Sequence, residues 1–223
     1  MTALTPKRLA RPLRRAGRAI HLAALKRVDP LEAARVTHRE TRHARARRFL
    51  RQYVAPGGIG AEVGVFWAHF SEVLLREFKP ARLYLVDPWD LLHGETFQFV
   101  SPYTLDGKLT TATAMERAMR LARRHPGQVT VSRAFSVDFF AGFEDAHFDW
   151  VYLDAAHTYE AVTADLAAIW PKLKPGGVLL GDDYYVRKDG SDNGTKRAID
   201  EFVAQHGLEL VVERRAQFVL PKP

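Results

Sequence analysis

The strongest constraint on the fold is an alternation of short apolar runs with helical stretches, which begins at Gly57. The apolar runs are rich in Val, Ile, Leu and aromatic residues and predict strands at 59–65, 82–87, 128–133, 148–154, 177–181, 208–213 and 217–220. The stretches between them predict helices at 68–78, 113–124, 137–143, 158–173 and 195–206. Strands that alternate with helices pair in parallel through right-handed crossovers. The predicted fold is therefore a doubly wound α/β sheet.

The end of the chain departs from this alternation. Only residues 214–216 separate the last two predicted strands, and so short a link requires a hairpin. We therefore expect a mostly parallel, seven-stranded sheet with a C-terminal antiparallel hairpin. Two local signals predict helix ends: Thr113 with Glu116 as a capping box, and the Lys-Pro-Gly-Gly sequence at 174–177 as a stop. Residues 89–109 lack periodicity, which is typical of a lid or binding loop.

Composition narrows the classes of protein that remain. Cysteine is absent, which excludes disulfides, thiolate zinc sites and a cysteine nucleophile, and no histidine pair has the HExxH spacing. A metal would therefore be held by oxygens or by scattered histidines. No apolar run reaches the roughly 20 residues of a membrane-spanning helix, and the amino terminus lacks the apolar core of a secretory signal. We expect a reducing, cytoplasmic location.

Charge divides the chain into two parts. Residues 1–51 hold 15 Lys and Arg against three acids, and the remaining residues hold 18 basic against 23 acidic ones. We expect 1–51 to be a basic helical N-terminal extension and 52–223 to be the functional domain. The extension suits an anionic membrane surface, a nucleic acid, an organelle-targeting role, or packing on the body or on a second copy in a homo-oligomer. We favour the last, packing on the body or on a second copy, because a run of charged residues usually forms a solvent-exposed helix face and does not by itself indicate a binding site.

The first two predicted strands end in residues that suit a nucleoside. Gly64 would let the backbone turn tightly beside a ligand at the end of the first strand. Asp87 ends the second strand, 23 positions later, where an acid can accept both hydroxyls of a ribose. Alone, Asp87 could equally cap a turn, and the glycine turn favours the ribose.

Three acids follow the fourth and fifth predicted strands. Asp154 ends one strand, while Asp182 and Asp183 follow the other, so neighbouring strands would bring their carboxylates together. A divalent cation such as Mg²⁺ would relieve their repulsion; alternatively, one acid pairs with a basic residue and another caps a helix. His157 lies three residues after Asp154, where it could remove a proton from a metal-bound hydroxyl or could be structural.

Together these residues resemble the class I S-adenosylmethionine-dependent methyltransferases over roughly 57–220. The segment 62–71 resembles that family's first motif, and 86–89, 153–160 and 173–177 with 182–184 are similar to the metal-dependent, macrocin-type sugar O-methyltransferases. The resemblance implies metal ligands at Asp154, Asp182 and Asp183, a base at His157, and a set of cofactor-binding residues comprising Glu62, Gly64, Ser71, Asp87, Phe135 and Ser136. Two positions depart from the pattern: Ala68 replaces a second glycine, and Ala134-Phe135 stands where the family commonly has Gly-Asp beside the adenine.

The expected activity is transfer of the methyl group of S-adenosylmethionine to a hydroxyl of a small molecule, for which a sugar is one candidate. We expect a divalent cation to assist, and Mg²⁺ is the cation we expect. Two alternatives stay open. One is an RNA methyltransferase anchored by the basic N-terminal extension, called the basic arm below. We do not, however, expect nucleic acid as a partner. The other is a non-catalytic cofactor-binding scaffold attached to a membrane surface by the arm.

Overall fold

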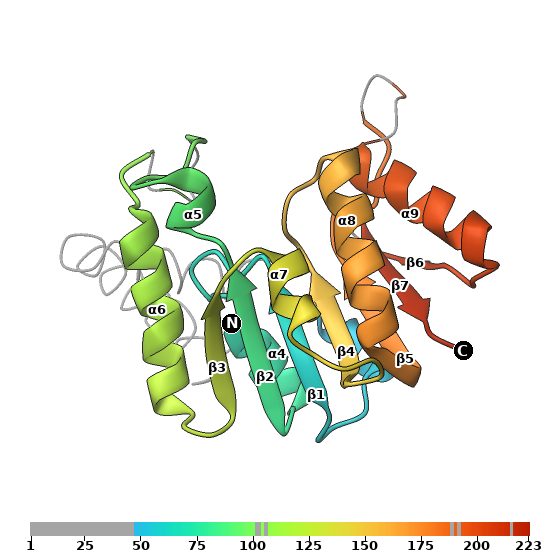
Figure 1. Cartoon of the computed structure of the whole chain (residues 1–223), viewed down its shortest axis with the longest axis horizontal. Helices are drawn as coiled ribbons and strands as arrows, with labels where there is room; N and C mark the ends of the chain where they lie inside the picture. The colour runs from blue at the N-terminus through green and yellow to red at the C-terminus, as the bar shows by residue number, and fades with distance from the viewer. Residues whose placement is uncertain (1–46, 101–103, 105–106, 188–189, 191–192, 215) are drawn as a thin grey trace, which may run out of the picture.

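The computed structural model describes residues 47–223 apart from 101–103, 105–106, 188–189, 191–192 and 215. Seven strands form one sheet in the order β3-β2-β1-β4-β5-β7-β6 (Figure 1). Their bounds are β1 Ile59–Val63, β2 Arg82–Asp87, β3 Val129–Arg133, β4 Phe148–Leu153, β5 Leu173–Gly181, β6 Val211–Glu213 and β7 Gln217–Pro221. Strands β1 to β5 pair in parallel, and β7 runs antiparallel to both β5 and β6. The predicted doubly wound α/β sheet with its terminal hairpin is confirmed.

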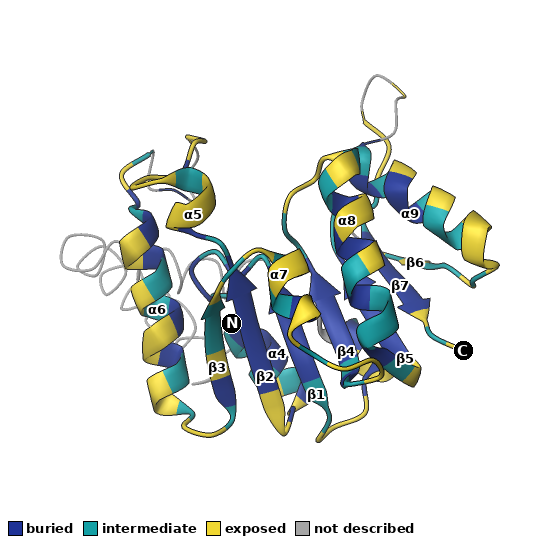
Figure 2. Ribbon diagram, viewed as in Figure 1, coloured by how far each residue is buried: buried dark blue, intermediate teal, exposed yellow. Residues whose placement is uncertain are grey.

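Helices cover both faces of the sheet. Their bounds are η1 Arg47–Tyr53, α4 Ser71–Phe78, α5 Asp90–His93, α6 Thr111–Arg124, α7 Ser136–Ala141, α8 Tyr159–Ile169, η3 Trp170–Lys172 and α9 Gly194–His206. One apolar core joins η1, α4 and α6 to one face, and a second core joins α7, α8 and α9 to the other. Figure 2 shows the central strands as the most buried part of the chain between these layers.

The strands bury side chains on both faces because alternate residues point to opposite sides. In β2, Leu83 and Leu85 belong to the core under α4 and α6, whereas Tyr84 and Val86 belong to the core under α7. Such two-sided burial explains why β2 reads as a continuous apolar run in the sequence. It also leaves the strand ends as the places where polar side chains can face a ligand.

Helix starts differ from the predictions where the backbone adopts unusual angles. The helix expected from residue 68 begins at Ser71, because Phe66 and Ala68 have φ of +56° and +62°, outside the right-handed helical range. The capping box expected at Thr113 is wrong. Thr110 caps α6, and its hydroxyl accepts from the Thr113 N–H at 3.1 Å, while Glu116 pairs with Arg123.

The helix stop expected at 174–177 is also misplaced. Helix α8 ends at Ile169, a 3₁₀ turn follows, and 174–177 lies inside β5. The Lys174 ammonium contacts Asp149 at 2.8 Å across the β4–β5 pair. The register of that pair shifts between Phe148 and Trp150, which accommodates the two glycines within the strand.

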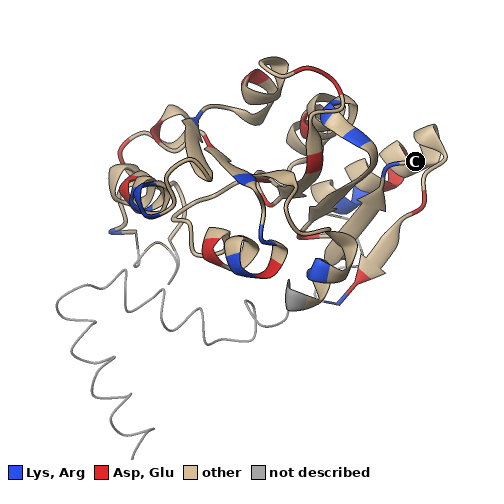
Figure 3. Ribbon diagram, turned by 90° about the horizontal axis from the view of Figure 1, so that it is seen from below, with Lys and Arg blue, Asp and Glu red and all other residues tan. Residues whose placement is uncertain are grey.

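The expected boundary at 51/52 falls inside η1. Leu50 is fully buried in the core against α4, and the Tyr53 hydroxyl donates to Glu213 at 2.7 Å, so η1 packs as part of the domain. The basic helices expected within 1–46 lie outside the described residues. Acidic and basic positions are interspersed along the described ribbon (Figure 3). Within that part of the chain, no helix has the length and apolar character needed to cross a bilayer.

Candidate active site

A cavity of about 770 Å³ opens at the carboxyl ends of the parallel strands. It lies where the strand order reverses between β1 and β4, the position at which open α/β sheets bind ligands. Residues following β1, β2, β3, β4 and β5 all contribute to its wall. Six carboxylates line it, namely Glu62, Asp87, Asp154, Asp165, Asp182 and Asp183. The described lining contains no Lys or Arg, which favours a ligand that carries positive charge.

Gly64 forms the tight turn that the sequence predicts after β1. Its φ is +87°, and its N–H donates to the Val86 carbonyl at 2.9 Å. A Cβ at this position would lie 2.0 Å from the Asp154 carbonyl oxygen. Glycine is therefore required because the turn after β1 closely approaches the turn after β4. This approach places the backbone of Asp154 directly against Gly64.

Asp87 lies at the end of β2 in the cavity wall, with 7% of its surface exposed. One carboxylate oxygen accepts from the Phe66 N–H at 2.8 Å, and the other accepts from the Trp89 N–H at 2.7 Å. Desolvation by burial raises the pKa of Asp87 to about 6, and hydrogen bonds from backbone N–H groups, those of Phe66 and Trp89 first, act in the opposite direction. Each oxygen keeps a lone pair with which it could accept from a ribose hydroxyl.

Glu62 and Ser71 form a buried pair. Glu62 lines the cavity, whereas Ser71 begins α4 outside the lining and donates its hydroxyl hydrogen bond to the Glu62 carboxylate. The structure therefore places Ser71 behind Glu62, where it orients that carboxylate.

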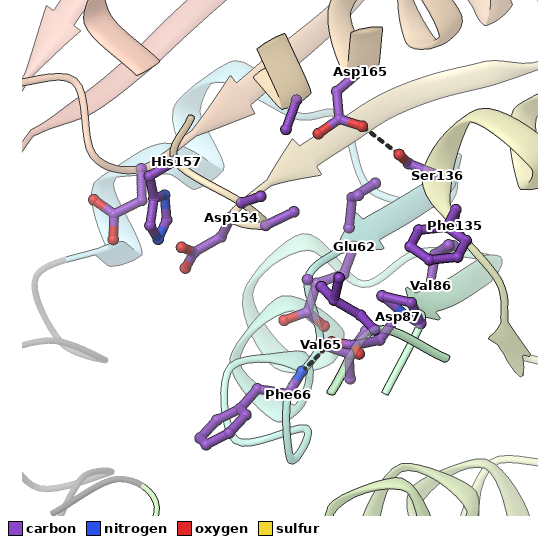
Figure 4. Close-up of a pocket in the computed structure, with 18 of the residues that line it drawn as sticks. Glu62, Val65, Phe66, Val86, Asp87, Phe135, Ser136, Asp154, His157 and Asp165 are labelled. Carbon is purple, nitrogen blue, oxygen red and sulfur yellow. Dashed lines mark hydrogen bonds between the residues drawn. The ribbon is translucent and has the colours of Figure 1, made fainter. Parts of the chain in front are cut away.

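Phe135 and Ser136 follow β3 at the other side of the cavity (Figure 4). The Phe135 residue is 42% exposed, and its ring borders the cavity. Ser136 begins α7 and donates to the carboxylate of Asp165 on α8, a buried residue that the sequence interpretation missed. Desolvation raises the pKa of Asp165 to about 6. The only sequence signal was an acid at position 165 on the apolar face of a helix, beside the buried Val162 and Leu166.

Asp154, His157 and Asp183 meet at the opposite end. One ligand atom from each lies within 4.8 Å of the others, and His157 Nδ1 is 3.2 Å from an Asp183 carboxylate oxygen. In Figure 4 the His157 and Asp154 side chains lie on the same side of the cavity, away from Phe135. Asp182 lines the cavity but is outside this group. Its carboxylate accepts from the Gln217 amide, which is itself bonded to the Tyr152 hydroxyl at 2.9 Å.

Asn193 and Gly194 hold this end of the site together. The Asn193 side chain caps α9 through the Lys196 N–H at 2.8 Å and donates to the Asp183 carbonyl at 2.5 Å. A Cβ on Gly194 would lie 2.4 Å from the His157 carbonyl oxygen. The start of α9 is thus tied to both Asp183 and His157. Asp183 itself has φ of +63°, a conformation that the surrounding contacts must maintain.

The segment expected to be a binding loop contains a short helix. Phe97 and Phe99 follow α5 and line the cavity with Phe66, and the centroids of Phe66 and Phe97 are 4.6 Å apart. Arg133, at the end of β3, holds α5 through two hydrogen bonds of 2.6 Å to the Asp90 carboxylate. This side of the cavity is therefore aromatic.

Residues 58–184, more than half of the chain, match a family model described as a methyltransferase domain. The chain belongs to this methyltransferase family. The matched segment begins one residue before β1 and ends one residue after Asp183. It therefore contains β1 to β5 and the residues after these strands that line the cavity. No curated protein matches the chain in sequence.

Solved structures show the same fold at low sequence identity. A protein from Corynebacterium glutamicum has a TM-score of 0.57 and 16% identity, covering 82% of this chain and 91% of its own. A methyltransferase from Streptococcus mutans in complex with SAH has a TM-score of 0.54 and 11% identity, with coverages of 82% and 99%. The O-methyltransferase NovP has a TM-score of 0.52 and 18% identity, with coverages of 81% and 79%. The methyltransferase domain thus has the class I, Rossmann-like fold.

Proposed function

We propose that the protein transfers the methyl group of S-adenosylmethionine to a hydroxyl group of a small molecule. The observation that carries the proposal is a single acidic cavity in which a glycine turn and a strand-end acid face an Asp-His-Asp group. Cationic cofactors suit a cavity wall whose described residues include six carboxylates and no Lys or Arg, and S-adenosylmethionine carries a sulfonium and an ammonium group. The complex of the Streptococcus mutans methyltransferase with SAH supports this choice of cofactor.

Asp87 would accept hydrogen bonds from the ribose hydroxyls. Its carboxylate is already oriented by the backbone N–H groups of Phe66 and Trp89, so little ordering is needed on binding. Glu62, held by Ser71, would place negative charge near the ammonium group of the methionine part, which the turn at Gly64 would accommodate. Phe135 would offer its ring to the purine.

Methyl transfer needs an aligned oxygen and a place for its proton. When bound, S-adenosylmethionine would supply the methyl group: the hydroxyl oxygen would bond to the methyl carbon as the carbon–sulfur bond breaks, which would leave a neutral thioether. The hydroxyl proton passes to His157, whose Nδ1 faces Asp183 and whose Nε2 is then the nitrogen that accepts it. Asp183 fixes the ring orientation and stabilises the imidazolium that forms.

A divalent cation fits the same group of residues in part. Two carboxylates and one imidazole offer mixed oxygen and nitrogen donors, which suit Mn²⁺ better than Mg²⁺, a cation that prefers oxygen ligands. Asp154 and Asp183 would hold such a cation, with Asp182 available only if it exchanges its bond to Gln217. When bound, the cation would lower the pKa of the acceptor hydroxyl.

The test combines cofactor binding with turnover. Calorimetry of wild type with S-adenosylhomocysteine should show binding, and Asp87→Ala should weaken it by about 30-fold or more, since two charge-assisted hydrogen bonds are lost. Labelled methyl transfer to panels of sugars and phenols, with Mg²⁺, Mn²⁺ or a chelator, then reports the acceptor and the metal. Unchanged affinity in a folded Asp87→Ala protein would contradict the cofactor site, and full activity under exhaustive chelation would exclude the metal.

An RNA methyltransferase is the second candidate from the sequence. In the described part of the chain, acidic and basic residues are interspersed (Figure 3), so RNA affinity would depend on residues 1–46. RNA binding that weakens steeply with salt and disappears when the arm is removed would favour this candidate. Tight cofactor binding without turnover on any hydroxylated compound would instead favour the non-catalytic scaffold.

A further inference from the structure

Asp165 is a buried carboxylate whose bonding is incomplete. It comes from α8 and lines the cavity, with 5% of its surface exposed. Among the described residues, the Ser136 hydroxyl is the only donor to its carboxylate, and no Lys or Arg lies in the described cavity wall. Asp87 differs, because each of its two oxygens has a backbone donor. A buried carboxylate with unused acceptor capacity is costly unless a ligand supplies a donor.

The position of Asp165 identifies the part of the ligand that would reach it. The Ala134 N–H donates to the carbonyl of Asp87 at 3.2 Å, and Phe135 and Ser136 follow directly. Two residues span at most about 7 Å, so Ser136 and Asp165 lie within the reach of a nucleoside whose ribose is held by Asp87. Figure 4 shows Asp165, Ser136 and Phe135 on one side of the cavity, with Asp154 and His157 on the other.

We propose that Asp165, oriented by Ser136, accepts a hydrogen bond from the exocyclic amino group of the adenine ring. The proposal rests on the proposed function and specifies how its cofactor is recognised. An ionised carboxylate accepts and cannot donate, whereas the 6-amino group of adenine donates. A 6-oxo purine presents an acceptor instead and would face the carboxylate with like partial charge. Asp165 would therefore supply, from α8, the polar contact that Ala134 and Phe135 do not offer after β3.

The test compares S-adenosylhomocysteine with S-inosylhomocysteine, whose purine has an oxo group at position 6 and an N–H in place of the unprotonated nitrogen at position 1. Wild type at pH 7.5 should bind the adenine compound about 10- to 100-fold more tightly, as measured by calorimetry. Asp165→Asn can donate to the oxo group, so its preference should fall to about threefold or less. Asp138→Asn is the control, because it removes a carboxylate from the exposed face of α7 without touching the cavity.

A second measurement keeps the proposal testable if Asp165→Asn does not fold. With wild type alone, the affinity ratio of the two ligands should narrow between pH 7.5 and pH 5, because protonation removes the acceptor at Asp165. Asp87 titrates in the same range but contacts the ribose common to both ligands, and Glu62 and Asp154 likewise face their shared parts, so the ratio cancels those effects. A constant ratio across pH, or a wild-type ratio in Asp165→Asn, would overturn this proposal alone. Failure of wild type to bind either ligand would overturn the proposed function with it.

Discussion

At the residue scale, three of the six carboxylates that line the cavity are buried, namely Glu62, Asp87 and Asp165. Burial raises the pKa values of Asp87 and Asp165 to about 6, and desolvation is the largest cause for each. The charged forms are thus maintained at neutral pH at some cost to the stability of the ligand-free protein. A protein selected for stability alone would not keep such groups, so their presence in one cavity supports a binding role.

Replacing Asp165 with Asn should reveal this cost. Because the folded pKa of Asp165 is raised from 3.8, its stabilising contribution is complete below about pH 4 and is lost as the pH rises through about 6. Asn carries no charge at either pH. Relative to wild type, Asp165→Asn should therefore gain up to about 3 kcal/mol in the free energy of unfolding between pH 4 and pH 7.5. Denaturant unfolding at both pH values checks this, and parallel curves for the two proteins would contradict it.

His157→Ala separates catalysis from metal binding. If His157 is the general base, the rate should fall about 10²- to 10⁴-fold, cofactor and metal affinities should change little, and the residual activity should rise with pH. If the imidazole instead holds a cation with Asp154 and Asp183, metal affinity measured by calorimetry should fall together with the rate. A folded variant with the wild-type rate and pH profile would remove His157 from the mechanism.

At the element scale, the site depends on how closely the turns after neighbouring strands approach one another. The turn after β1 contacts the turn after β4 through Gly64 and Asp154, and the start of α9 contacts His157 and Asp183 through Gly194 and Asn193. The approaches at Gly64 and Gly194 are to backbone atoms, and the Asn193 side chain bonds the Asp183 carbonyl, so together they set the spacing of Asp154, His157 and Asp183. The elements therefore act as a rigid frame for the acidic cavity.

Substitution of Gly64 tests this frame. Gly64→Ala would place a Cβ 2.0 Å from the Asp154 carbonyl oxygen at a φ of +87°, so we expect a loss of about 3 kcal/mol or more in unfolding free energy. Gly176→Ala is the matched control. Its φ is +74°, but nothing lies within 4 Å of the added Cβ, so about 1 kcal/mol should be lost. Equal losses in the two variants, measured by chemical denaturation, would show that the close approach to Asp154 does not matter.

At the scale of the whole molecule, the described domain is one sheet with a core on each face, and η1 belongs to it. Leu50 is fully buried, and Gln52 and Tyr53 both donate to Glu213 at the end of β6, within the C-terminal hairpin. The net charge of the chain comes from residues before this domain, while the cavity itself is acidic. The basic arm and the binding cavity are thus electrostatically distinct.

Two truncations should locate the start of the domain. A chain lacking residues 1–46 keeps η1 and every cavity residue, so its melting temperature and its affinity for S-adenosylhomocysteine should stay close to those of the full chain. A chain lacking 1–53 also loses Leu50 and Tyr53, and uncovering that core should cost about 3 kcal/mol or more. Thermal unfolding of both proteins decides the matter. Equal stability of the two truncations would place the boundary after η1.

The sequence by itself determined the order of the strands along the chain and their mostly parallel pairing. Strands buried on both faces appear as continuous apolar runs, and the turns after them carry glycine and acidic residues. Gly64, Asp87 and Asp154 could be found in this way, since Asp87 is the last residue of β2 and the other two directly follow β1 and β4. Helix starts were harder to predict. Phe66 and Ala68 adopt left-handed backbone angles, and neither position carries the glycine that would signal such angles in the sequence.

Only the tertiary structure decided which strand-end acids meet. Asp183 joins Asp154 and His157, whereas Asp182, one residue earlier, is held by Gln217 from β7. Ser71 supports Glu62 from behind, and Asp165 reaches the cavity from the middle of α8 to meet Ser136, 29 residues away. These pairings follow from the packing of helices on the sheet, and packing joins residues whose separation along the chain carries no periodic signal. The sequence therefore determines the acidic edge of the sheet, and the fold selects which of its carboxylates act together.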